Sequence, residues 1–139
     1  MISLSLLLYS LLCAGAWLLV ISVIFELIER RLHLTHGIPE EMLESTSWVW
    51  WGINFLMETM FYVAIPTIAY AFFYFSLPFE GTRAGMAAVL YAFTIGAAPA
   101  LMGLSVRVKL PMSFVLFLLL SYLVKIGGTL IIIAYLYSL

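Results

Sequence analysis

The chain has 139 residues, of which 65% are hydrophobic, 16% aromatic and only 9% charged. A soluble domain of this size carries about a quarter charged residues, so this chain has too little polar surface to cover a globule in water. The formal net charge of −1 offers no basic surface to nucleic acid. The composition therefore predicts an integral membrane protein whose solvent is the lipid bilayer.

Four hydrophobic segments follow one another along the chain, each near the roughly 20 residues that cross a bilayer. Backbone polar groups in lipid must be satisfied within each segment, so we expect helices. No Lys or Arg precedes the first segment, and we expect it to be retained as a span rather than cleaved. The sequence predicts one all-α domain over residues 1–139, a four-transmembrane-helix antiparallel bundle with spans at 2–27, 48–75, 84–106 and 112–137.

The connection after the first span keeps helical character past the expected membrane edge. Gly37 is typical of the position just after a helix, and Pro39 is typical of the first turn of the next one. The pattern predicts that helices 1 and 2 extend into the cytoplasm. The first helix would end near His36, and the two would meet at a tight turn.

Histidines and carboxylates gather around this turn. Glu29, His33 and His36 recur at spacings that share one face of a continuous helix. Such side chains bind divalent metals, although they are also ordinary choices near helix termini. The candidate metal ligands are Glu29, His33, His36, Glu40 and Glu44. Apart from this divalent metal, no cofactor is expected.

Basic residues in the short loops predict the orientation. One side of the expected bundle carries Arg30, Arg31, Arg107 and Lys109, and the other carries Arg83. This bias predicts a multi-pass protein of the cell (cytoplasmic) membrane with both termini on the non-cytoplasmic side. Tryptophans at the start of the second span are typical of a membrane interface.

Two ionisable residues lie deep within expected spans. On the second helix, Asn54, Glu58 and Tyr62 lie four residues apart, and Lys125 interrupts the last apolar segment at a similar depth. A charge at the bilayer centre costs about 2.5–3.5 kcal/mol, so such residues usually face the bundle interior and pair. We expect Lys125 to meet Glu58, with hydrogen bonds from Asn54 and the tyrosines. The candidate site comprises Glu58, Lys125, Asn54, Tyr62, Ser121 and Tyr122.

Two interpretations of this pair remain open from the sequence. In one, the pair is a buried lock that fixes how the helices pack. In the other, it lines a cavity that binds a small polar solute or relays protons. Pairing alone does not decide between them, because a buried salt bridge is weak evidence for stability.

The third helix carries small residues at every fourth position, a spacing that lets membrane helices approach closely. They are Ala88, Ala92, Gly96 and Ala100. Packing within the bundle and contact with another copy are both consistent with this stripe. Pro66 and Pro99 are each expected to bend their helix, because proline lacks the N–H of the helical ladder.

Three functions are consistent with these features. The first is translocation of a small solute, protons or ions by a homo-oligomer, with Glu58 and Lys125 at the site. The second is a non-catalytic subunit or assembly factor of a larger membrane complex. The third is a metal-binding membrane enzyme that uses the histidine cluster. Catalysis is the less favoured class, because the chain has no Asp and no glycine-rich phosphate loop.

Overall fold

The computed structural model describes residues 3–42 and 47–139. Within those residues all of the regular structure is helical. The helices that are long and apolar enough to cross a membrane are Leu4–Leu32, Trp48–Phe73, Gly81–Arg107 and Met112–Tyr137. The prediction of an all-helical chain with four segments of this kind is confirmed, with boundaries that differ by a few residues.

Two of the four segments are interrupted near their centres. The first and fourth are the uninterrupted helices α1 (Leu4–Leu32) and α6 (Met112–Tyr137). The second consists of α2 (Trp48–Thr59), a π-helical turn (Met60–Ala64) and α3 (Ile65–Phe73). The third consists of α4 (Gly81–Tyr91), a π-helical turn (Ala92–Ala97) and α5 (Ala98–Arg107). Short 3₁₀ turns lie at Glu40–Met42 and Tyr74–Ser76.

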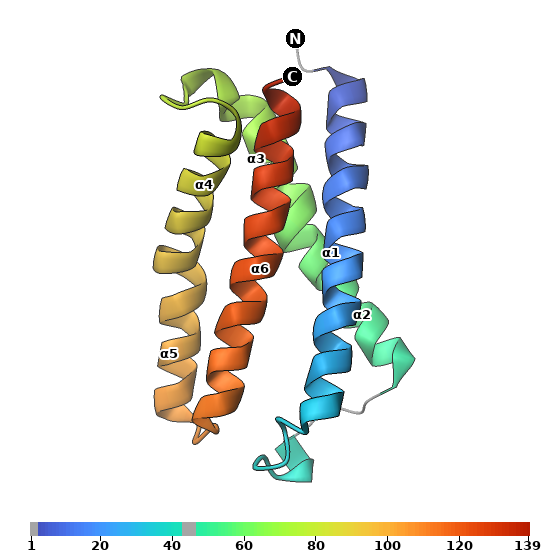
Figure 1. The fold of residues 1–139 in the computed structure, drawn as a ribbon, viewed down its shortest axis with the longest axis vertical. Helices are drawn as coiled ribbons and strands as arrows, with labels where there is room; N and C mark the ends of the chain where they lie inside the picture. Colours follow the sequence, from blue (N-terminus) through green and yellow to red (C-terminus); the bar gives the residue numbers. More distant parts are fainter. Residues whose placement is uncertain (1–2, 43–46) are drawn as a thin grey trace.

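Helix α6 lies at the centre of the molecule, with α1 on one flank and α4 and α5 on the other (Figure 1). The second segment crosses obliquely behind them, so that α3 lies behind α6 while α2 diverges from α5. Both chain ends lie at the same end of the molecule, and the connections after α1 and α5 lie at the opposite end. Because α6 contacts neighbours on several sides, it is the most buried of the four segments.

The contact between α1 and α6 is tight. Helix α1 buries every fourth residue along one face, namely Ser10, Ala14, Leu18 and Ser22. The indole ring of Trp17 lies directly over Gly128, where an added Cβ would overlap the ring. Glycine at this position therefore allows α1 to approach α6 closely, as small residues do between membrane helices.

The contact between α4 and α6 also depends on a glycine. A Cβ added to Gly85 would lie 2.9 Å from the Cα of Ile131 and 3.1 Å from the Cβ of Ala134. Lower on the same segment, a Cβ added to Gly96 would meet nothing within 4 Å. The small residues of the third segment thus pack closely near its start and leave space near its centre.

Both π-helical turns end two residues before a proline. Pro66 has no N–H to donate to Tyr62, and the wider turn before it closes with a bond from Ile65 N to Met60 O. The turn before Pro99 closes in the same way, from Ala98 N to Phe93 O. The sequence predicted a bend at each proline, and the structure places a π-helical turn there. Such turns are often found at functional sites.

The connection after α1 differs in part from the prediction. Helix α1 continues past the predicted end of the span at Leu27 but ends at Leu32, and His33 adopts a left-handed conformation with φ 48°, so the helix does not reach His36. Turns and one 3₁₀ turn follow, so the described residues beyond Leu32 do not form the rest of the expected helical extension. Gly37 instead allows a close approach: a Cβ there would lie 3.0 Å from Cγ of Pro111 in the α5–α6 connection.

Candidate functional site

Lys125 and Glu58 form an ion pair near the middle of the fourth and second segments, with Glu58 at the end of α2. The Lys125 ammonium donates to both carboxylate oxygens of Glu58, at 2.8 and 3.0 Å. Their side chains are only 10% and 12% exposed, respectively. The predicted pairing of these two residues is therefore confirmed, and each charge has its counter-charge within the low-dielectric interior.

A third helix contributes to this pair. The hydroxyl of Ser22 on α1 donates to Oε2 of Glu58 at 3.3 Å. We expected such bonds from Asn54 and the tyrosines, but among the described side chains it is Ser22 that supplies one. Serine is common in apolar helices, so the presence of a serine at position 22 did not by itself indicate a partner for Glu58. Its spacing of four residues from Glu26 placed it on the face that carries Glu26 and Glu29.

A small polar cavity of about 110 Å³ reaches the pair from the end of the molecule where α1 ends. Because about 10–15 Å³ of such space is enough for one water, the cavity has room for several water molecules. Glu26 and Glu29 line it together with Glu58 and Lys125. Glu26 accepts a bond from Arg30 Nε at 2.8 Å, whereas Glu29 makes no hydrogen bond or ion pair with any described residue. Glu29 is therefore available to exchange a proton with water in this cavity.

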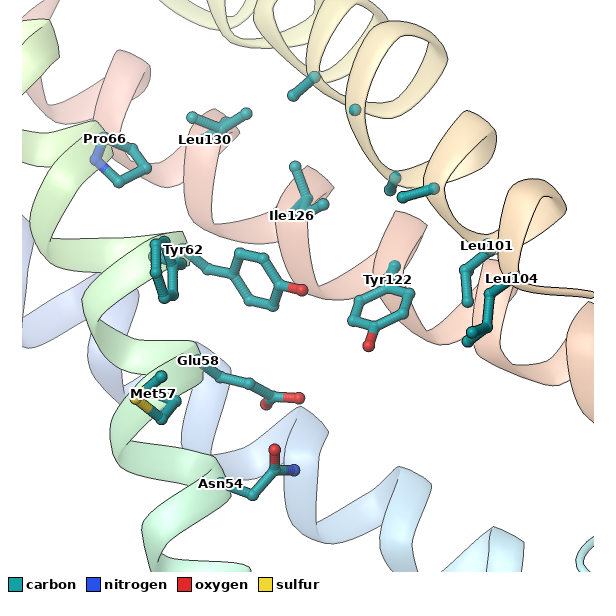
Figure 2. Close-up of a pocket in the computed structure, with 15 residues that line it drawn as sticks. Asn54, Met57, Glu58, Tyr62, Pro66, Leu101, Leu104, Tyr122, Ile126 and Leu130 are labelled. Carbon is teal, nitrogen blue, oxygen red and sulfur yellow. The ribbon is translucent and has the colours of Figure 1, made fainter. Parts of the chain in front are cut away.

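A larger groove of about 770 Å³ reaches Glu58 from the other side. It lies where α2 diverges from α5, and its floor is α6 (Figures 1 and 2). Gly96 and Ala100 form one wall, and Leu101, Ile126 and Leu130 add apolar surface. Because Met57 and Phe61 on its rim are exposed, the groove opens sideways on the apolar outer surface.

Figure 2 shows polar groups gathered at the base of this groove. The hydroxyls of Tyr62 and Tyr122, the Glu58 carboxylate and the Asn54 amide all point into the space between α2 and α6. The two tyrosine rings contact each other edge-to-face with centroids 6.0 Å apart. The groove is thus apolar along its walls and polar at one place only.

The same three side chains border both cavities. Asn54, Glu58 and Tyr122 line the small polar cavity and also the large groove. They form the partition between the polar cavity and the apolar groove. Of the six predicted site residues, Ser121 and Lys125 line only the polar cavity and Tyr62 lines only the groove. Glu58 therefore borders both spaces, whereas Lys125 borders the polar cavity alone.

The predicted metal ligands are not brought together. Because α1 ends at Leu32, Glu29 stays in the polar cavity, while His33, His36 and Glu40 line a separate cavity in the turn. Within the residues that the structure describes, no three His, Cys, Asp or Glu side chains form a group able to hold a metal. Glu44 lies outside the described residues.

This arrangement is suited to proton transfer. The Lys125 ammonium and the Glu58 carboxylate are an acid and a base in direct hydrogen-bond contact, which is the geometry that proton transfer needs.

Comparisons of the chain with protein-family models, curated proteins and solved structures gave no match.

Proposed function

We propose that the chain is inserted in a membrane as an antiparallel four-helix bundle and moves protons, alone or with a small solute, through the site at Glu58 and Lys125. One observation carries this proposal: Asn54, Glu58 and Tyr122 border a polar cavity on one side and an apolar groove on the other. A buried lock needs no cavity on either side. A translocation site needs access from both.

Protons would enter through the polar cavity. Glu29 exchanges a proton with water there and passes it toward Lys125, whose ammonium donates to Glu58. When the Glu58 carboxylate accepts that proton, the pair becomes neutral and the Lys125 amine accepts the next proton from the cavity. Protonated Glu58 then gives its proton to a hydroxyl group in the groove, which releases its own proton to water, and the carboxylate is restored.

The proposed orientation places the α1–α2 connection in the cytoplasm and both termini outside the cell membrane. Arg30, Arg31, Arg107 and Lys109 favour this orientation, since Lys and Arg are enriched in short cytoplasmic loops. Cysteine introduced at Thr35 should react with a membrane-impermeant maleimide only after the cells are opened. Cysteine introduced at Ser138 should react in intact cells, and the reverse result would invert the orientation.

We also propose that the protein works as a homo-oligomer, because four helices are too few to enclose a complete transport path. Its outer surface is rich in exposed large apolar side chains, including Leu8, Leu12 and Leu19 on α1. Chemical cross-linking in native membranes should give a discrete multiple of the 15.6 kDa chain. A monomer at all concentrations would contradict this part of the proposal.

Proton flux into liposomes tests the function directly. Purified protein is reconstituted with a pH-sensitive dye inside, and an acid step is applied outside. We expect Glu58→Gln to lower the flux by about a hundredfold, which is typical of losing a group that transfers a proton. Glu80→Gln removes a carboxylate far from the site and should leave the flux unchanged. Equal flux from Glu58→Gln and the unaltered protein would rule out the proposed site.

A non-catalytic subunit of a larger complex remains the second candidate, and one observation favours it. The wall around Gly96 has space beside it that a helix of another protein would fill. In that case, purification from native membranes would recover a stable partner in a fixed ratio, and the isolated chain would carry no proton flux.

A further inference from the structure

We propose that the large groove is a binding site for an uncharged, lipid-soluble molecule with an apolar body and one hydrogen-bonding head group. This inference rests on the proposed function because it names the kind of solute that meets the proton at Glu58. It is drawn from the groove's volume, its opening, and the charge balance at its base.

The volume and the opening suit a molecule that arrives from the bilayer. About 770 Å³ lies within the range of roughly 300–1,000 Å³ that holds a ligand of drug or lipid size. Met57 and Phe61 are more than half exposed at the rim, so the entrance faces the surroundings of the bundle and not its polar ends. A polar solute would have to pass through hydrocarbon to reach this entrance.

The chemistry at the base selects an uncharged head group. Glu58 already has two hydrogen bonds from Lys125 and one from Ser22, so its charge is balanced. A cationic head would compete with Lys125 for the same carboxylate. An anionic head would stand beside that carboxylate and would be repelled. A hydroxyl or carbonyl head can instead hydrogen-bond to the Tyr62 and Tyr122 hydroxyls, which point into the groove (Figure 2).

The apolar body would lie along the third segment. Ala92, Gly96, Ala97 and Ala100 line that wall. A Cβ at Gly96 would meet nothing within 4 Å, so this wall is open to a ligand. The π-helical turns before Pro66 and Pro99 both contribute residues to the groove, Tyr62 from one and Ala92, Gly96 and Ala97 from the other. The two irregular turns therefore shape opposite walls of the same space.

Photo-cross-linking in lipid nanodiscs tests the inference. The probe is a long-chain alcohol that carries a photoreactive diazirine, and the comparisons are the fatty acid and the alkylamine of the same length. We expect the alcohol to label peptides around Glu58 and Gly96 about tenfold more than the acid or amine does, which is the ratio that a single well-placed head group provides. Equal labelling by all three probes would mean that the groove only samples bulk lipid, and would overturn the proposal.

Two glycines give a matched pair of variants. Gly96 and Gly103 lie on the same segment, and neither would meet an atom within 4 Å if a Cβ were added, but only Gly96 lines the groove. We expect Gly96→Leu to abolish the alcohol labelling and Gly103→Leu to preserve it. Labelling that survives Gly96→Leu contradicts the proposal. So does a loss of oligomers caused by Gly96→Leu alone, because a second copy would then occupy the groove.

The labelling result is separable from the proposed function. If the unaltered protein shows selective alcohol labelling but no proton flux, the groove is a ligand site and the translocation proposal fails. If proton flux is present but the labelling shows no head-group preference, the translocation proposal stands and the ligand class is wrong.

Discussion

The two sides of α6 differ in how they are packed. Toward α1, the indole of Trp17 fills the space over Gly128, and a face with Ala14 and Leu18 is completely buried. Toward α2 and α5, the same helix forms the floor of an open groove. The residues are similarly apolar on both sides, so composition does not explain the difference. We infer that the α1 side is the scaffold and that the groove side is the site.

The largest expected effect on stability comes from adding a side chain at the tightly packed contact between α1 and α6. Gly128→Leu would drive a side chain into Trp17, so we expect α1 and α6 to separate and folded protein to be lost. Gly96→Leu adds the same atoms to the open side, where a Cβ meets nothing within 4 Å, and should fold normally. Thermal unfolding in detergent measures both. Equal tolerance of the two variants would contradict the division into scaffold and site.

The second-largest expected effect on stability comes from breaking the ion pair between Lys125 and Glu58. Lys125→Met leaves the Glu58 carboxylate buried without its counter-charge. Removing one partner of a buried pair costs about 3–5 kcal/mol of stability. The free energy of unfolding in a denaturant titration should fall by this amount. A change below about 1 kcal/mol would indicate an exposed pair.

Replacing Glu29, where protons are proposed to enter the polar cavity, should affect proton flux more than stability. Glu29 makes no hydrogen bond or ion pair with a described residue, so Glu29→Gln should change stability by less than about 0.5 kcal/mol. We expect the liposome flux to fall by about tenfold or more, because a proton-transferring group is lost. Glu26→Gln is the matched control, since Glu26 is already bound by Arg30. Equal losses from the two variants would show that neither carboxylate is the specific entry point.

The smallest effect is expected at Ser22. Its hydroxyl donates to Glu58 over a long 3.3 Å bond, and side-chain hydrogen bonds between membrane helices are worth about 0.6 kcal/mol on average. Ser22→Ala should therefore lower the free energy of unfolding only by about that amount. A loss of several kcal/mol would mean that α1 is held to the site chiefly by this bond and not by packing at Gly128.

The sequence was sufficient to predict the helices and the central pair. A lysine and a glutamate in long apolar segments are costly unless they meet, and this physical constraint identifies both partners without a structure. The pairing needed only that Glu58 and Lys125 lie at similar depth. Element types and approximate boundaries were predictable because four long apolar segments, if they lie in lipid, can satisfy their backbone groups only as helices.

Other features depended on relationships that the sequence does not encode locally. The groove exists because α2 diverges from α5, and no spacing within either helix reveals that angle. Gly37 was wrongly predicted to follow the end of the first helix. Its lack of a side chain instead lets the turn lie close to Pro111, which is far along the chain. The predicted grouping of Glu29 with His33 and His36 required a continuous helix, which ends at Leu32.

The measurement that tests the central claim most directly is proton flux through the double variant Glu58→Met/Lys125→Met. Two apolar side chains of similar length replace the buried pair, a change that often preserves or increases stability. The protein should therefore remain folded. We expect the flux in liposomes to be lost while thermal stability stays at or above that of the unaltered protein. Full flux in this folded variant would show that the pair only locks the helices together.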